Sequence, residues 1–225
     1  MINGTSAATE QINGSLLYVG ELLHRIANEY ASAISLASGL AARSSSAEAR
    51  EALREVIDHL HALAATHNLL RPPLRNGIVD LSGNIAQLCS AMASAGLEKR
   101  GIRFHLALTE TITVEEKQCW HASLIIAELV TNAARHASLS WGGRVSVSIG
   151  STSERIICRV RDSGSCGTTF NPGLGSLLVN ALANGIHGRI ERQFDSSGMA
   201  VTLSFPRQTR CVADRAALNQ VRGML

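Results

Sequence analysis

The stretch Ile125-Ile126-Ala127-Glu128-Leu129-Val130-Thr131-Asn132-Ala133-Ala134-Arg135-His136-Ala137 indicates the fold of this chain most clearly. At helical spacing, Glu128, Asn132 and either Arg135 or His136 share one face. The opposite face is apolar and consists of Ile126, Val130, Ala133 and Ala137. The pattern therefore predicts a helix that buries one face and presents a carboxylate, an amide and a base on the other.

Two glycine motifs follow this helix. Asp162-Ser163-Gly164 ends an alternating apolar run, and Gly173-Leu174-Gly175 stands directly before another amphipathic segment. Either motif alone is also compatible with an ordinary turn. In this order, after a helix that carries an amide and a carboxylate, they indicate a nucleotide site.

The composition favours helices packed on a sheet. The chain has 225 residues, of which 45% are hydrophobic and only 4% are aromatic, which allows one large domain or two small ones. The formal net charge is +3, and the Lys and Arg residues are scattered along the sequence. Nucleic acid is therefore not indicated as a partner.

The five cysteines and the N-terminus indicate the compartment. The cysteines are odd in number, and no two have Cys-x-x-Cys spacing, which favours free thiols over a disulfide framework or a zinc site. The sequence also lacks a basic segment followed by an apolar run at its start, and it has no apolar run of about 18 residues. We expect a soluble cytoplasmic protein that does not enter a membrane.

The first 71 residues are predicted to form a helical hairpin. One helix spans about residues 15–40, and Ser45 with Glu48 three residues later forms a capping box that starts the second. Apolar residues recur in each helix at alternating spacings of three and four residues and form a seam along it. In the first helix this repeat is interrupted at Gly20. The first seam is Leu16, Leu23, Ala27, Tyr30, Ile34 and Ala37, and the second is Ala49, Leu53, Val56, Leu60, Leu63, His67 and Leu70.

A lone hairpin has one apolar seam and no third layer to cover it. Two copies side by side would form a four-helix bundle, which favours a homodimer. Packing of the hairpin onto the rest of the same chain would also cover it.

An α/β sandwich is predicted beyond the hairpin. Two consecutive prolines, Pro72 and Pro73, end the second helix and begin a linker over residues 72–79. Asp80 can cap a helix that runs to about Lys99. The further helices are expected around residues 125–137 and over 174–186, and the extended segments over residues 102–108, 111–114, 144–149, 155–160, 188–194 and 199–205.

The predicted fold class is thus α+β, a helical hairpin followed by an antiparallel-rich sheet of roughly five strands with helices on one face. We divide the chain into a hairpin dimerisation and phosphotransfer domain (1–71), a linker (72–79), an ATPase-like catalytic domain (80–206) and a C-terminal tail (207–225).

The order of these motifs resembles the core of two-component histidine kinases. The closest resemblance is to the subgroup whose H-box reads His-Arg-x-x-Asn, here His24-Arg25-Ile26-Ala27-Asn28, and it extends over about residues 16–206. The resemblance implies a catalytic domain of the GHKL (Bergerat) type, ATP and Mg²⁺ as cofactors, and a response-regulator receiver domain as partner. The chain also resembles the related kinase-like histidine phosphotransferases.

The polar residues of the helix predicted over residues 125–137 suit the binding of a metal ion and phosphate. The amide oxygen of Asn132 is a hard ligand suited to Mg²⁺, and Glu128 one turn earlier could orient a metal-bound water or act as a base. Arg135 and His136, one turn later, could approach phosphate oxygens. The resemblance implies the same metal-binding role for Asn132.

The glycine motifs supply the rest of the candidate site. Asp162 offers an acceptor for the adenine amino group, and Gly164 leaves room for the base. Gly173 and Gly175 allow backbone N–H groups at a helix start to face phosphate. The resemblance implies an adenine contact for Asp162 and places the glycines around the triphosphate.

His24 is the predicted phosphoacceptor. It follows the seam residue Leu23, so its ring should project from the flank of the bundle into solvent. Asn28 lies one turn further on the same face, where it could hold the orientation and tautomer of the ring.

The sequence departs from the family pattern at the nucleotide lid. Cys166 stands where the family usually has the second glycine of Asp-x-Gly-x-Gly, and only eight residues separate Gly164 from Gly173. The Trp-x-Glu motif of a sister subgroup is absent at Trp141. No sensor domain precedes the hairpin, so we expect the signal to come from a separate protein.

Two functions remain open at this point. The first is an ATP-dependent histidine kinase, which the intact Glu128, Asn132, His136, Asp162, Gly173 and Gly175 favour. The second is a dimeric histidine phosphotransferase with a degenerate ATP site, which the short lid and Cys166 favour. A regulator that phosphorylates a partner's serine is a third hypothesis, but it would need no acceptor helix.

Overall fold

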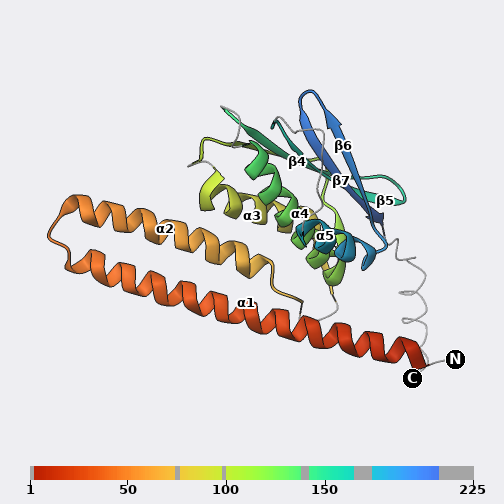
Figure 1. The fold of residues 1–225 in the computed structure, drawn as a ribbon, viewed down its shortest axis with the longest axis horizontal. Helices are drawn as coiled ribbons and strands as arrows, with labels where there is room; N and C mark the ends of the chain where they lie inside the picture. The colour runs from red at the N-terminus through yellow and green to blue at the C-terminus, as the bar shows by residue number, and fades with distance from the viewer. Residues whose placement is uncertain (1–2, 74–76, 98–99, 138–141, 165–173, 208–225) are drawn as a thin grey trace, which may run out of the picture.

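The computed structural model describes residues 3–73, 77–97, 100–137, 142–164 and 174–207. Its N-terminal part is an antiparallel pair of helices, α1 (Asn3–Arg43) and α2 (Ala47–Leu69) (Figure 1). The predicted hairpin is confirmed, although α1 begins about twelve residues before the predicted start. The side chains of residues 3–20, and with them the seam residue Leu16, lie outside what the structure describes.

The start of α2 differs by one residue from the prediction. Ser46, not Ser45, is the N-cap: its backbone is extended, with φ −79° and ψ 126°, and its hydroxyl accepts a hydrogen bond from the Ala49 N–H at 3.2 Å. An N-cap residue must leave helical geometry while its side chain reaches the N–H three residues on. Ser46 meets both conditions, and the predicted capping box of Ser45 with Glu48 is wrong.

The seam between α1 and α2 lies close to where the periodicity predicts it. Tyr30 stacks obliquely on His67 across the hairpin, with ring centroids 5.3 Å apart, and Ala37 is buried. Val56 is 49% exposed, and the neighbouring Ile57 is half-buried in its place. The seam therefore steps by four residues from Leu53 rather than by the predicted three.

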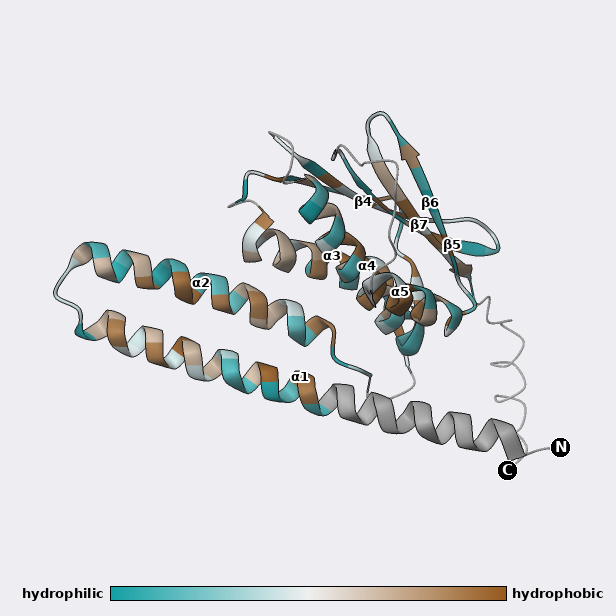
Figure 2. Cartoon of the chain, in the orientation of Figure 1, coloured by the Kyte–Doolittle hydropathy of each residue, from teal (hydrophilic) through white to brown (hydrophobic). Residues whose placement is uncertain are grey.

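A second apolar row runs along the outside of α1. It consists of Leu22, Ile26, Leu36 and Leu40, which are 41%, 36%, 65% and 44% exposed. Figure 2 shows apolar residues recurring along the described part of both helices. The hairpin thus keeps an apolar surface that its own two helices do not cover.

The second part of the chain is built on a five-stranded sheet of order β2-β4-β5-β7-β6. The strands are β2 (Arg103–Leu108), β4 (Arg144–Ser151), β5 (Arg155–Asp162), β6 (Arg189–Asp195) and β7 (Gly198–Pro206). Only β2 and β4 pair in parallel, and the other three pairs are antiparallel. This confirms the antiparallel-rich sheet predicted from the alternating segments.

A small separate sheet joins β1 (Ile78–Asp80) to β3 (Thr113–Glu115). Residues 78 and 79, predicted as the end of the linker, are therefore strand residues. The pairing of Val79 with Val114 gives this segment a fixed place beside the larger sheet. No local signal in a three-residue strand predicts such a pairing, because its partner lies more than thirty residues away.

Helices cover one face of the large sheet (Figure 1). They are α3 (Leu81–Met92), the short segment η1 (Ala93–Leu97) with a kink at Gly96, α4 (Glu116–Ala137) and α5 (Leu174–Asn184). Asp80 caps α3 as predicted, accepting a hydrogen bond from the Gly83 N–H at 3.0 Å. The fully buried residues Ile85, Ile125, Val147 and Phe205 belong to the single core between the two layers. The predicted α+β fold class is confirmed.

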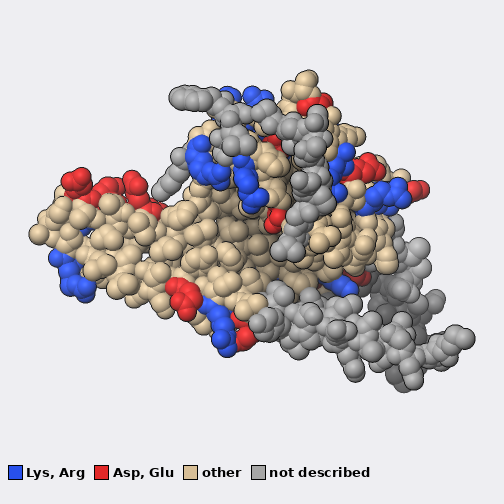
Figure 3. Space-filling view, in the orientation of Figure 1, with Lys and Arg blue, Asp and Glu red and all other residues tan. Residues whose placement is uncertain are grey.

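The hairpin meets the helical layer of the sheet domain through α2. This helix packs against α3 and η1, and the indole N–H of Trp120 on α4 donates a hydrogen bond to the Leu70 carbonyl at 2.8 Å. The far end of α2 carries acidic side chains that face solvent (Figure 3), namely Glu48, Glu51, Glu55 and Asp58. Across the described segments, no helix has the length and hydropathy that a bilayer span requires.

The three described cysteines are buried free thiols, as expected. Burial raises the pKa of Cys89 and Cys158 to about 12 and that of Cys119 to about 11. These thiols therefore stay protonated and serve as small core residues. Cys166 and Cys211 lie outside the described residues.

Candidate functional site

The site is built on the outer face of α4. Ile126, Val130, Ala133 and Ala137 are all buried against the sheet, as the periodicity predicts. Glu128 and Asn132 are half-buried on the other face, one turn apart. Because the buried face fixes the rotation of the helix, the polar side chains have a defined direction.

A row of hydrogen bonds links the polar side chains of α4. The Asn132 Nδ2 group donates to Glu128 Oε1 at 2.8 Å, and Arg135 Nη1 donates to Asn132 Oδ1 at 3.2 Å. The carboxylate can only accept, so it holds the amide nitrogen and turns the amide oxygen toward Arg135. The oxygen of Asn132 is thus presented as a ligand by its neighbour one turn earlier.

Asp162 lies at the end of β5 and is only 4% exposed. Its Oδ1 accepts a hydrogen bond from the Gly164 N–H at 2.8 Å. Its Oδ2 lies 3.7 Å from Nδ1 of His136, which is too long for a hydrogen bond but close enough for an ion pair if the ring is protonated. Nδ1 of His136 is buried and has no hydrogen-bond partner within the described structure. A nearly buried carboxylate with one oxygen in use can accept a donor from a ligand.

Two glycines allow the elements around α4 to approach it closely. A Cβ atom on Gly164 would lie 2.8 Å from the main-chain carbon and oxygen of His136, so the turn after β5 requires glycine. A Cβ atom on Gly175, in the first turn of α5, would lie 2.8 Å from Cδ of Glu128. The expectation that Gly164 makes room for a base is therefore incomplete, because the α4 backbone already requires a glycine there.

The structure gathers most of the predicted nucleotide-site residues around the C-terminal half of α4. They are Glu128, Asn132, Arg135 and His136 on α4, Asp162 and Gly164 after β5, and Gly175 at the start of α5. Both Arg135 and His136 belong to this group of residues. Arg135 donates a hydrogen bond to Asn132, and His136 lies close to Asp162. Gly173, Cys166 and the predicted lid lie outside the described residues.

His24 and Asn28 lie apart from this group, on α1. Both side chains are exposed on the flank of the hairpin, as predicted, and Asn28 Nδ2 lies 3.4 Å from His24 Nδ1. The amide can present either its nitrogen or its oxygen to the ring, so this contact is compatible with both tautomers.

The sequence did not point to Ser163 and Arg144, which secure the end of β5. The Arg144 N–H donates to the Ser163 hydroxyl oxygen at 2.8 Å, and the Ser163 N–H donates to the Arg144 carbonyl at 3.0 Å. These bonds fasten the residue after Asp162 to the start of β4. A serine between Asp and Gly carries no sequence signal that distinguishes this role from that of an ordinary turn residue.

The residues fit the nucleotide and metal that the sequence motifs imply. An amide oxygen and a carboxylate suit a hard cation, a guanidinium suits phosphate oxygens, and a buried carboxylate oxygen suits an exocyclic amino group. The absence of a side chain at Gly175 lets the Glu128 carboxylate pack against the start of α5, where N–H groups lack intrahelical partners. The described residues therefore offer groups that suit ATP and Mg²⁺.

Two family profiles match the chain and together span residues 21–205. The profile described as "Histidine kinase" matches residues 21–95, and the profile described as "Histidine kinase-like ATPase domain" matches residues 95–205. Curated protein sequences give no significant match.

Solved histidine kinases share the fold. The histidine kinase domain of the blue-light-activated kinase EL346 from Erythrobacter litoralis superposes with a TM-score of 0.55 at 18% identity, covering 79% of this chain and 96% of that one. AdeS from Acinetobacter baumannii gives 0.51 at 21% identity, covering 72% and 82%. Full-length ShkA in complex with AMPPNP gives 0.51 at 20% identity, covering 87% of this chain and 46% of ShkA.

The helical hairpin, the one-sided sheet domain and the two family profiles agree with one another. The chain therefore has the core of a two-component histidine kinase, a helical hairpin joined to a GHKL-type ATPase domain.

Proposed function

We propose that this protein is a histidine kinase that transfers the γ-phosphoryl group of ATP to His24 and then to an aspartate of a response-regulator receiver domain. The observation that carries the proposal is the hydrogen-bonded row from Glu128 through Asn132 to Arg135, with Asp162 nearly buried at the adjacent strand end. A protein that does not bind ATP would have no need to keep these side chains in this arrangement.

Each part of the nucleotide has a candidate contact. Asp162 would accept a hydrogen bond from the adenine amino group through Oδ2, because Oδ1 is already held by the Gly164 N–H. Arg135 would bind phosphate oxygens, and the first-turn N–H groups of α5 around Gly175 would face them. The AMPPNP complex of ShkA, a protein of the same fold, supports a nucleotide as the ligand of this site.

Asn132 would be the metal ligand contributed by the protein. Bound Mg²⁺ would neutralise charge on the phosphates. Glu128 keeps the amide oxygen of Asn132 turned outward. Its second oxygen has no hydrogen bond to a described residue and could orient a water or accept a proton. The protein contributes mainly position and charge, as is usual for phosphoryl transfer.

His24 would be the nucleophile. Its ring is exposed on α1, and Asn28 lies beside Nδ1. With the Asn28 amide oxygen accepting from the Nδ1–H, the lone pair of Nε2 would be available to attack the γ-phosphorus. In that step the N–P bond forms, the bond to the ADP oxygen breaks, and ADP leaves. Exposure on the hairpin flank also gives a receiver domain access to the phosphorylated ring.

The kinase would work as a homodimer. Leu22, Ile26, Leu36 and Leu40 form an exposed apolar row on α1 that a second hairpin could cover in a four-helix bundle. We retain the division into domains at 1–71, 72–79, 80–206 and 207–225, a cytoplasmic location, and a separate upstream partner as parts of this proposal.

Binding of a non-hydrolysable ATP analogue, measured by calorimetry with Mg²⁺, tests the nucleotide site. We expect binding in the wild type and at least about tenfold weaker binding in Asp162→Asn, because the amide presents a donor where adenine needs an acceptor. Asp195→Asn, which changes an exposed carboxylate on β6, is the matched control and should bind normally.

The short predicted lid favours the phosphotransferase as the second candidate function. Absence of nucleotide binding in the folded wild-type protein would contradict the kinase. Phosphoryl transfer to His24 from a phosphorylated receiver domain would then support the phosphotransferase.

A further inference from the structure

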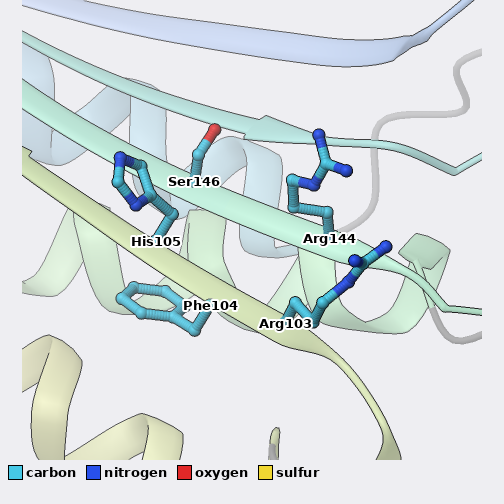
Figure 4. Close-up of a pocket in the computed structure, with 5 residues that line it drawn as sticks. All are labelled: Arg103, Phe104, His105, Arg144 and Ser146. Carbon is cyan, nitrogen blue, oxygen red and sulfur yellow. The ribbon is translucent and has the colours of Figure 1, made fainter.

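The open face of the sheet, opposite the helices, carries a cationic hollow that the proposed kinase chemistry does not use. It is lined by Arg103, Phe104 and His105 of β2 and by Arg144 and Ser146 of β4. Figure 4 shows His105, Arg144 and Ser146 projecting on one side of the two strands, while Phe104 points toward the helices. None of the described residues that line the hollow is acidic.

The strand register places like charges side by side. Arg103 is the direct partner of Arg144 in the parallel β2–β4 pair. His105 is the partner of Ser146, two residues further along both strands. Like charges opposite each other on neighbouring strands destabilise a sheet unless a counter-charge is present. The two arginines and the His105–Ser146 pair thus form a two-by-two array of hydrogen-bond donors.

Other arginines on this face have hydrogen-bond partners within the chain, and one of them has a counter-charge. Arg161 pairs with Asp195 at 2.8 Å, Arg159 donates to Gln193 at 3.3 Å, and Arg155 donates to Ser204. A second hollow on the same face is lined by Arg155 and Arg189 but also contains Glu191. The second hollow thus contains a carboxylate among its arginines, whereas the described lining of the β2–β4 hollow does not.

Within the described part of the chain, Arg103 and Arg144 have no such counter-charge. Among the described contacts, the Arg103 side chain donates to a neutral group, the Gly142 carbonyl at 3.3 Å. The Arg144 side chain has no hydrogen bond or ion pair to a described residue. Two guanidinium groups match a dianion better than a single carboxylate, and their planar forks suit tetrahedral oxyanions.

We propose that this hollow is a binding site for a phosphate monoester group, with Arg103 and Arg144 as the charged clamp and His105 and Ser146 as further donors. The site is distinct from the nucleotide site, because Asp162 and Gly175 belong to the helical side of the sheet. The group could be a free phosphate or a phosphorylated side chain on another protein, since the same donors recognise both.

Backbone amide chemical shifts test the proposal on the intact 225-residue chain. Inorganic phosphate, added at constant ionic strength, should shift the amides of Arg103, His105, Arg144 and Ser146 in a saturable way. Arg144→Gln should weaken this binding by about tenfold or more, because it removes one charged donor set. Arg189→Gln, on the same face of the sheet, is the matched control and should bind as the wild type does.

A peptide with one phosphoserine, compared with its unphosphorylated form, distinguishes the sources. Much tighter binding than inorganic phosphate would identify a phosphorylated protein as the ligand, and equal binding would identify the free anion. Absence of saturable shifts at these four amides, or equal weakening by Arg144→Gln and Arg189→Gln, would overturn the proposal. Shifts confined to Gly164 and Gly175 would also overturn it, since they would place phosphate in the nucleotide site.

Discussion

Glu128 is the side chain on which the geometry of the nucleotide site depends most. It accepts the hydrogen bond that orients the Asn132 amide, and its Cδ occupies the space next to Gly175. A carboxylate so confined from two directions cannot change rotamer without disturbing its neighbours. The proposed metal ligand is therefore held by a contact between α4 and α5.

Replacing Gly175 by alanine tests this arrangement. The new methyl group would displace the Glu128 carboxylate and break its bond to Asn132, so we expect at least about tenfold weaker nucleotide binding. Folding should change by no more than about 1 kcal/mol, because alanine favours the helix. Calorimetry and thermal unfolding measure the two effects.

Gly39→Ala is the control, since its Cβ atom would meet only Arg43 at an ordinary distance of 3.7 Å. If Gly175→Ala bound the nucleotide as tightly as Gly39→Ala does, the close contact between α5 and Glu128 would have no functional meaning.

Helix ends and helix contacts carry the stability of the individual elements. Ser46 caps α2 through its hydroxyl, and His121 of α4 donates from Nδ1 to the Leu182 carbonyl of α5 at 3.0 Å. The first contact is local in sequence, whereas the second joins residues about sixty positions apart. They lead to two different tests.

Removal of the Ser46 hydroxyl should destabilise the hairpin by about 1 kcal/mol, which lowers the melting temperature by roughly 2–4 °C. Ser45→Ala should leave it unchanged, because Ser45 does not cap the helix. Thermal unfolding followed by circular dichroism gives both values. A larger loss of stability in Ser45→Ala than in Ser46→Ala would support the capping box of Ser45 with Glu48 predicted from the sequence.

Burial lowers the pKa of His121 below its ordinary value of 6.5, with Lys117 adding to the effect. The folded protein therefore favours the neutral ring, and the unfolded chain takes up the proton first as the pH falls. Stability from this residue is complete above about pH 6.5 and decreases below it.

His121→Gln keeps an N–H donor for Leu182 but does not titrate. Melting temperatures compared near pH 7.5 and pH 5.5 should fall less in this variant than in the wild type. An equal or larger decrease in the variant would show that other histidines dominate the acid sensitivity.

The elements that local patterns specify were predicted well from the sequence. The apolar face of α4 and the cap at Asp80 lie as expected, because helical periodicity and capping involve residues only three or four positions apart. The parallel pairing of β2 with β4 and the bond from Trp120 to Leu70 were not predictable. Such contacts join segments tens of residues apart, and no local preference selects the partner.

The candidate site likewise combines features that local sequence predicts with contacts that only the fold determines. Glu128 and Asn132 were predicted together because they share one helix face. The approach of His136 to Asp162, and the reason for glycine at position 164, depend on how β5 meets α4. The sequence identifies these residue types, but only the packed structure gives the contact that each one makes.

At the scale of the whole molecule, the uncovered apolar row on α1 predicts how the protein assembles. The double variant Leu36→Ser with Leu40→Ser should weaken the dimer by at least about 100-fold, because each buried leucine contributes about 1.5–3 kcal/mol. Sedimentation as a function of concentration measures the change. The monomer fold should persist, since both side chains are exposed within one chain.

Leu177→Ser is the matched control, because Leu177 is an exposed leucine on α5, outside the hairpin. Dissociation by this variant, or an unchanged dimer in the double variant, would move the interface away from α1.

The central claim is that ATP phosphorylates His24, and incubation with γ-labelled ATP and Mg²⁺ tests it most directly. We expect acid-labile label on the wild type and on the controls His61→Ala and Thr131→Ala, which change an exposed histidine of α2 and an exposed neighbour of Asn132. His24→Ala and Asn132→Ala should carry no label. Label that persists in His24→Ala, or its absence from a wild-type protein that binds the nucleotide, would contradict the account.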